Sequence, residues 1–334
     1  MSMRKVCAAC LTALFAAGTA TALQAADAAK TAPSTFKPGT YTATVNGHNA
    51  PVTVKVTVSK NRIEKIDTSK NLETIGVGRV ALKLMTDKIL KYQSLGVDAI
   101  TGASISSLAL LSGVEKCLEQ AGGNIDKLTE QVEKHPAGTK TYDADVVVIG
   151  GGGSGLATAI AAYQAGAKKV IVVEKLGYLG GSTNVSEGAL NAVDPKRQGK
   201  QGIEDSFEKF YDQTMKGGHN KGNPELVKYL TQNSMKSVEW LESMGVKFKD
   251  EIGTATGALW QRSHYPATPS GNTYIRSFEQ VIKDTNGAIQ VLTDTAATDL
   301  LQDKGRITGV TAKHFDQKVI LNAKDGVVIA TGGF

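Results

Sequence analysis

The chain has 334 residues, which is enough for two domains of ordinary size. Hydrophobic residues make up 41% of it and charged residues 21%, and these proportions exclude an intrinsically disordered protein. The net charge is +6, from 38 Lys and Arg residues against 32 Asp and Glu residues, and these charges are dispersed along the chain. Such a weak, scattered excess excludes a basic nucleic-acid-binding surface as the basis of function.

The first 25 residues have the layout of a secretory signal peptide. Arg4 and Lys5 precede an apolar run from Val6 to Ala17, and small residues follow up to Ala25. The run is too short to cross a hydrocarbon core of about 30 Å at about 1.5 Å per residue, so we favour a cleaved signal over a membrane anchor. The sequence therefore predicts an exported, periplasmic protein.

Cysteine is rare in this chain. Cys7 and Cys10 lie in the predicted signal peptide, and Leu11 stands where a haem-attachment motif requires histidine. Cys117 is then the one cysteine of the mature chain, so we expect no internal disulfide. Its place on an apolar helical face predicts a position in the core. Redox chemistry in this chain would need a cofactor other than covalently attached haem.

A compact α+β unit is predicted over residues 39–121, between a flexible lead-in at 26–38 and a linker at 122–141. Alternating apolar residues predict its strands, and helical spacing predicts its helices. The predicted strands cover 41–45, 52–58 and 63–66, and the predicted helices cover 80–90 and 106–118.

An α/β unit with a Rossmann-like start is predicted over residues 142–334. The continuous apolar run 145–149 is typical of a buried parallel strand, and an Ala-rich helix follows it up to Gly166. The other predicted strands cover 170–173, 289–292, 307–312, 319–322 and 327–330, and the other predicted helices cover 204–214 and 224–244. The predicted fold class is therefore α/β, with an α+β unit placed before it.

The first chemical motif runs from Asp98 to Ser104 and directly precedes a predicted helix. Unpaired N–H groups at a helix N-terminus favour an anion, and small residues let a bulky group approach the backbone. The alternative is a plain helix cap made by Ser104 or Ser106.

The order Asp-x-x-Thr-Gly-Ala-Ser resembles the motif of the FMN-binding domain family, and so do residues 39–41 and 73–78. The resemblance implies that a flavin transferase esterifies the phosphate of FMN onto Ser104. The other motif residues that it implies are Asp98, Thr101, Gly102 and Ala103.

The second chemical motif is Gly150-x-Gly152-x-x-Gly155, between a predicted strand and a predicted helix. The acidic Glu174 ends the next strand, which is the context that a dinucleotide site requires. Gly150 permits the tight turn, Gly152 the approach of a pyrophosphate, and Gly155 close packing of helix on strand. We expect Ser154 to lie beside the diphosphate. We expect Glu174 to bind the ribose hydroxyls, which disfavours NADP.

The stretch from Gly180 to Ala192 resembles the second FAD loop of the fumarate reductase/succinate dehydrogenase flavoprotein family. Further segments resemble its soluble periplasmic branch, which includes flavocytochrome c fumarate reductases and urocanate reductase: 214–218, 223–224, 237–241, 244–245, 262–264 and 328–334. The resemblance implies FAD contacts at Gly181, Ser182, Thr183, Gly188, Ala189 and, near adenine, Ala297. Ser182 stands where membrane-bound relatives carry a flavin-linked histidine, which implies that FAD is bound non-covalently.

Two histidines are candidates for catalysis by residue type alone. We favour a structural Arg-Ser-His turn for His264 and a surface loop for His219. The sequence predicts no metal site.

The resemblance implies hydride transfer from FAD to an activated C=C bond, with a proton from an arginine in a clamp domain. Those residues are expected C-terminal to Phe334, so we expect no catalytic residue in this chain, which would be the first part of a longer reductase. The expected partners are a membrane quinol-linked donor and a small unsaturated carboxylate such as urocanate or fumarate. Two alternatives remain open: an electron-transfer flavin carrier or inactive fragment, and a flavin-dependent dehydrogenase or oxidase acting, for example, on a steroid.

Overall fold

The computed structural model describes residues 31–135, 137–268 and 270–333. The predicted signal peptide lies outside these residues. Within the described ranges, no helix is both long and apolar enough to cross a membrane.

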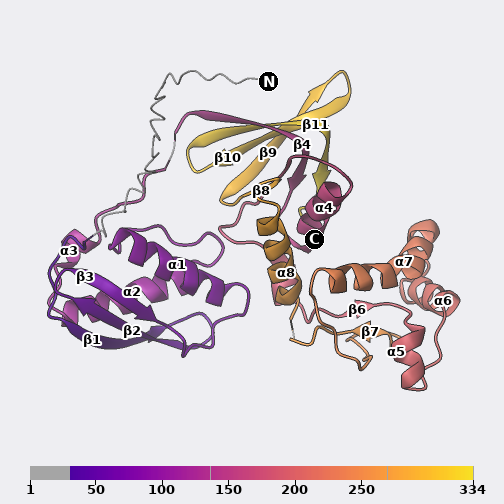
Figure 1. Ribbon diagram of the computed structural model, residues 1–334, viewed down its shortest axis with the longest axis horizontal. Coiled ribbons are helices and arrows are strands. Elements are labelled where there is room, and N and C mark those ends of the chain that lie inside the picture. The colour runs from indigo at the N-terminus through magenta and orange to yellow at the C-terminus, as the bar shows by residue number, and fades with distance from the viewer. Residues whose placement is uncertain (1–30, 136, 269, 334) are drawn as a thin grey trace, which may run out of the picture.

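Three antiparallel strands and two long helices form the N-terminal unit (Figure 1). The strands pair in chain order: β1 (Gly39–Asn46), β2 (Pro51–Ser59) and β3 (Arg62–Asp67). Helices α1 (Gly78–Tyr92) and α2 (Ser104–Gln120) pack on this sheet, and the short helix α3 (Ile125–Leu128) follows. The predicted strands and helices of this unit are confirmed, although α2 begins at Ser104 itself.

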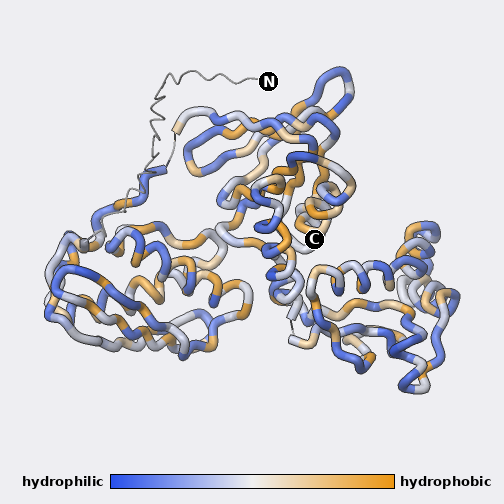
Figure 2. The backbone as a smooth tube through the Cα atoms, viewed as in Figure 1, coloured by the Kyte–Doolittle hydropathy of each residue, from blue (hydrophilic) through white to orange (hydrophobic). Residues whose placement is uncertain are grey.

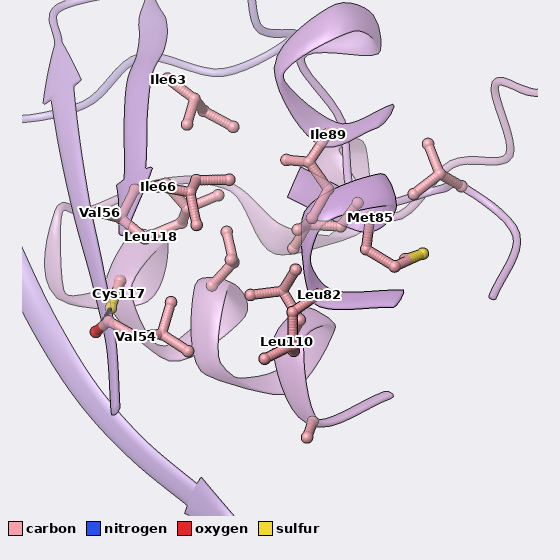
Figure 3. Close-up of a cluster of buried hydrophobic side chains, with 14 of the residues drawn as sticks. Val54, Val56, Ile63, Ile66, Leu82, Met85, Ile89, Leu110, Cys117 and Leu118 are labelled. Carbon is pink, nitrogen blue, oxygen red and sulfur yellow. Dashed lines mark hydrogen bonds between the residues drawn. The ribbon is translucent and has the colours of Figure 1, made fainter. Parts of the chain in front are cut away.

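The core of this unit lies between the sheet and the two helices. Val52, Val54, Val56 and Val58 alternate along β2 and are all buried, because successive side chains of a strand point to opposite faces. Figure 3 shows Val54 and Val56 on the side that faces the helices. Cys117 of α2 is fully buried here, as predicted.

Part of the segment predicted as a flexible lead-in is packed. Phe36 is 5% exposed and belongs to the core of the N-terminal unit. Its N–H donates to the carbonyl of Lys60 at 2.8 Å. A single aromatic residue in an Ala- and Thr-rich stretch has no periodic pattern, so no local signal predicts this contact.

A six-stranded sheet organises the second unit, in the order β8-β5-β4-β11-β10-β9. Its strands are β4 (Thr139–Ile149), β5 (Val170–Val173), β8 (Ile289–Leu292), β9 (Thr295–Asp303), β10 (Arg306–His314) and β11 (Gln317–Ile329). The first three and β11 run parallel, and β9 and β10 join antiparallel. The predicted α/β class is confirmed.

Both faces of this sheet are covered. Val148 of β4 packs with α4 (Gly153–Gln164) and α8 (Asn272–Asp284), whereas the neighbouring Val147 packs with residues of β10 and β11. Burial on both faces explains the unbroken valine run of the parallel strands. In Figure 2 the hydrophobic residues gather along the strands and helix faces that meet inside each unit.

Three features of the sheet differ from the sequence prediction. Strands predicted at 319–322 and 327–330 form one strand, β11, with a register irregularity between Ala323 and Gly326 that accommodates the intervening charged residues. Strand β9 was not predicted, because most of its residues are exposed at the sheet edge. Helix α8 was not predicted either, although Tyr274, Ile275 and Phe278 have helical spacing.

A mostly helical segment connects the loop after β5 to α8. It contains η1 (Gly181–Val185), β6 (Leu190–Asn191), α5 (Pro195–Lys200), α6 (Phe207–Gly217), α7 (Pro224–Ser243) and β7 (Ser263–His264). The helix predicted at 204–214 begins instead at Phe207, because the Ser206 side chain caps it by accepting from the Lys209 N–H.

Candidate functional site

The turn between β4 and α4 requires glycine at two of its motif positions. Gly150 has a left-handed φ of 110°, and a Cβ there would lie 2.3 Å from the carbonyl oxygen of Ala330. A Cβ at Gly155 would lie 1.8 Å from the carbonyl oxygen of Gly150. These two glycines therefore close the turn and seat the helix against it, as the motif predicts.

Gly152 serves a different purpose from its neighbours. The nearest atom to a Cβ at this position is the Gly180 carbonyl oxygen, 3.9 Å away. The space beside the first turn of α4 is therefore open, and the exposed Ser154 borders it. The first N–H groups of α4 have no side-chain cap, which suits a diphosphate.

The second predicted loop lies directly against the first. Gly180 donates its N–H to the carbonyl of Gly151 at 2.8 Å and forms a parallel bridge with Gly152. Ser182 is exposed, and Thr183 packs near Gly153. The structure therefore brings together both predicted diphosphate loops.

Two asparagines that the sequence analysis did not single out hold the second loop. Asn184 is 1% exposed and donates to the carbonyl of Leu179 at 2.5 Å. The Asn272 side chain in turn donates to Asn184 Oδ1 at 2.8 Å. These residues are 88 positions apart in the chain, so no local pattern could have revealed the pair.

Glu174 ends β5 beside the glycine-rich turn. Its carboxylate accepts N–H groups from Gly151 and Leu176, both at 2.7 Å, and the side chain is 8% exposed. The Thr295 N–H donates to the Glu174 carbonyl, which places the start of β9 here. Ala297 lies two residues further along that strand, paired with Ala312 of β10.

Gly188 and Ala189 lie at the far end of this loop. Gly188 has a φ of 78°, and Tyr274 donates its hydroxyl to the Gly188 carbonyl. The next residue after Ala189, Leu190, pairs with His264 across β6 and β7. His264 is fully buried and its ring also contacts the Asp194 carboxylate. His264 therefore lies in a short strand rather than in a turn, and its contacts are structural.

The attachment motif predicted for FMN lies at the start of α2. Ser104 is the first residue of the helix, and its exposed hydroxyl makes no hydrogen bond within the described ranges. The N-cap is Ala103, without a side-chain cap, and the Ser106 hydroxyl donates to Glu73 instead. The alternative of a cap by Ser104 or Ser106 is therefore wrong. Uncapped N–H groups beside a free hydroxyl fit an esterified phosphate.

Asp98 at the other end of the motif is held by the linker. Its carboxylate contacts His135 Nε2 at 2.6 Å and accepts from Gln131 Nε2 at 3.2 Å. The His135 ring stacks on Phe315, with ring centroids 3.9 Å apart. Asp98 is thus fixed from the linker side, away from the helix start.

The two sites touch. The Gly177 N–H donates to the Thr101 carbonyl at 3.3 Å, and Thr101 Oγ1 donates to Asp294 at 2.8 Å. A Cβ at Gly76 would lie 2.7 Å from Asn184 Cβ, inside the second loop. The two predicted flavin sites therefore share one boundary. No sequence motif predicted this contact.

Comparison with known proteins agrees with both predicted domain types. Residues 145–334 match the family of the FAD binding domain, and residues 47–119 match that of the FMN-binding domain. These matches confirm the two predicted cofactors, FAD and FMN, and the two predicted domain types.

Three curated relatives are each 33% identical to this chain. The NADH:acrylate oxidoreductase of Vibrio harveyi matches 90% of this chain and 36% of its own length. The NADH:fumarate oxidoreductase of Klebsiella pneumoniae matches 90% and 32%, and the urocanate reductase of Eggerthella lenta matches 88% and 49%. The chain therefore spans about a third to a half of the length of these relatives.

A solved structure resembles the second unit. The open conformation of a flavocytochrome c3 fumarate reductase superposes with a TM-score of 0.53 at 33% identity. The match covers 57% of this chain and 34% of that protein. This confirms the fold predicted from the resemblance.

Proposed function

This chain belongs to the FAD binding domain family and carries an FMN-binding domain before it, and from this premise we propose that it is the flavin-carrying part of an oxidoreductase that reduces the C=C bond of a small unsaturated carboxylate. The names of the three relatives specify acrylate, fumarate and urocanate. Together they favour a carboxylate over a steroid as the acceptor.

One structural observation carries the proposal: the FMN-attachment motif lies against the FAD loop, through the hydrogen bond from Gly177 to Thr101 and the packing of Gly76 on Asn184. When bound, the two flavins supply single-electron and hydride transfer. The residues of this chain would hold both groups at one boundary and exclude water from it.

Each residue of the FAD site would have a separate task. The first turn of α4 and the loop at Gly181, Ser182 and Thr183 would hold the diphosphate, and Glu174 the ribose. The backbone at Gly188 and Ala189 would lie against the flavin ring, and Ala297 near adenine. FAD would be held without a covalent bond, as the resemblance of the loop at Ser182 to that of membrane-bound relatives implies.

Ser104 would carry FMN through a phosphoester made by a flavin transferase. We test this with Ser104→Ala, using Ser112→Ala, later on the same helix, as the control. The first variant should lose acid-stable flavin fluorescence on a denaturing gel, and the second should keep it. Retained fluorescence in Ser104→Ala would reject the attachment site.

The protein would work in the periplasm and accept electrons from a quinol-linked membrane donor. The substrate-binding and proton-donating residues would lie C-terminal to Phe334. Intact-mass measurement of the protein exported by its host tests whether the signal is removed after residue 25 and whether the polypeptide is longer than this chain.

The reaction itself is tested with reduced methyl viologen as donor and acrylate, fumarate, urocanate and a steroid enone as acceptors. The proposal expects oxidation of the dye by at least one carboxylate and none by the enone. Flavin reduction without turnover of any acceptor by the intact protein would favour an electron carrier instead.

A further inference from the structure

Two residues of a five-residue segment of the second unit pack in the core of the first. Residues 175–179 connect Glu174, at the end of β5, to Gly180 of the second loop. Tyr178 in this segment is 8% exposed and belongs to the hydrophobic core of the N-terminal unit. Leu176 packs against the same core. Burial, with the nearby Glu174 carboxylate, raises the pKa of the Tyr178 hydroxyl.

The attachment motif lies on this segment. Gly102 has a φ of 85°, and a Cβ there would lie 2.9 Å from Leu176 Cδ2 and 3.3 Å from Tyr178 Cε1. A Cβ at Gly177 would lie 3.1 Å from Ile100 Cγ2. Side chains of each unit therefore pack directly over a glycine of the other, where a larger residue would have to displace them.

Asp294 connects the two partners. Its carboxylate accepts the Thr101 hydroxyl at 2.8 Å, and its own N–H donates to the Leu176 carbonyl at 3.0 Å. It has a left-handed φ of 50°, in the turn between β8 and β9. One residue thus contacts both the attachment motif and the segment that the motif packs on.

We propose that Tyr178 and Asp294 dock the FMN-attachment motif onto the FAD loop and are positioning residues for electron exchange between the two flavins. Tyr178 supplies the buried contact, and Asp294 fixes where Thr101 lies along it. The electron-exchange part of this inference rests on the proposed function, whereas the docking part stands without it.

The test compares three variants of the protein carrying both flavins. Asp294→Gly removes the carboxylate, and glycine readily adopts the left-handed φ of this position. Asp294→Asn keeps a carbonyl acceptor for Thr101. Asn286→Gly is the matched control, because Asn286 also has a left-handed φ, of 51°, and is exposed with no side-chain hydrogen bond among the described residues.

The first readout is trypsin cleavage after the exposed Lys134, in the segment between α3 and β4, which does not depend on enzyme activity. Cleavage in Asp294→Gly should be several-fold faster than in the parent, while Asp294→Asn and Asn286→Gly should match the parent. The second readout is the rate of FAD reduction after rapid reduction of FMN. It should fall at least several-fold in Asp294→Gly, with the content of both flavins unchanged.

Tyr178 is tested by the pair Tyr178→Ala and Tyr178→Phe. Loss of the ring should reproduce the effect of Asp294→Gly on both readouts, and the phenylalanine should restore parental values. The inference would be overturned if trypsin cleaved Asp294→Gly and Tyr178→Ala at the parental rate. It would also be overturned if cleavage were faster but the rate of electron exchange between the flavins were unchanged. If the parent protein exchanges electrons between its flavins and keeps its two units docked but reduces no carboxylate, only the proposed function is rejected. The docking inference then stands.

Discussion

His264 Nε2 lies 3.2 Å from Asp194 Oδ2, and His264 Nδ1 lies 3.2 Å from the carbonyl oxygen of Leu190, the residue after Ala189. Both partners are hydrogen-bond acceptors, so the ring donates to at least one of them. Burial alone would raise the pKa of the Asp194 carboxyl, but hydrogen bonds from Arg197 and His264 lower it below its usual value. The buried pair therefore fixes the end of the FAD loop.

The two histidines considered for catalysis should behave differently on substitution. His264→Ala removes a buried ring and leaves the Asp194 carboxylate short of a partner, so it should lower the free energy of unfolding by about 3 kcal/mol. It should also weaken FAD binding through the loop at Ala189. The control His219→Asn changes an exposed residue whose left-handed φ of 52° suits asparagine, and it should leave both unchanged within about 0.5 kcal/mol. Urea unfolding and FAD titration measure both quantities, and equal effects of the two variants would contradict the assignment.

The buried ion pair of Asp205 and Arg262 should be a major determinant of stability. Arg262 donates to the two Asp205 oxygens at 2.7 and 2.9 Å, and the side chains are 1% and 3% exposed. Asp205→Asn leaves the guanidinium uncompensated and should cost about 3–5 kcal/mol of unfolding free energy. Asp299→Asn, at an exposed position, is the control. A loss below about 1 kcal/mol would show that the pair has little net effect.

The same pair predicts a pH dependence. Burial alone would raise the pKa of the Asp205 carboxyl, but hydrogen bonds from Arg262 and Gln198 lower it. The pKa is thus lower in the folded chain than the value of about 3.9 in the unfolded one. The stabilisation is present above about pH 4 and is lost as the pH falls through the folded pKa. In urea unfolding, the difference between the parent and Asp205→Asn should therefore shrink below about pH 4. A constant difference down to pH 3 would contradict the ionised pair.

Cys117 should be inert in the folded protein. Its side chain is fully buried, and burial raises the pKa of its thiol, which disfavours the reactive thiolate. A thiol reagent should label Cys117 only at the rate of unfolding, and Cys117→Ser should cost about 1–3 kcal/mol because a hydroxyl replaces an apolar contact. Labelling of native protein within seconds would show that the thiol is accessible. The mature protein, without the predicted signal, is required here because Cys7 and Cys10 would react otherwise.

The sequence predicted the elements whose pattern is local. Alternating valines marked β2, a continuous valine run marked β4, and glycines at fixed spacing marked the turn into α4. It did not predict β9, because an exposed edge strand needs no apolar alternation. Nor did it predict the partners of Thr101 and Arg262, which lie 193 and 57 residues away. Those contacts depend on how the units fold together, which local patterns do not encode.

The three glycines of the turn after β4 allow a test that separates folding from FAD binding. Gly152→Ala adds a methyl group into open space, 3.9 Å from the Gly180 carbonyl oxygen. It should leave the free energy of unfolding without FAD nearly unchanged and still weaken FAD binding, because the methyl group would occupy the space of the diphosphate.

Gly155→Ala is the contrasting variant. Its methyl group would lie 1.8 Å from the Gly150 carbonyl oxygen, so the helix must shift away from the turn. The unfolding free energy should fall by about 1–3 kcal/mol even without FAD. Equilibrium unfolding and FAD titration of both variants separate the two effects. Parental FAD affinity in Gly152→Ala would show that the diphosphate lies elsewhere, because a diphosphate beside this position would collide with the added methyl group.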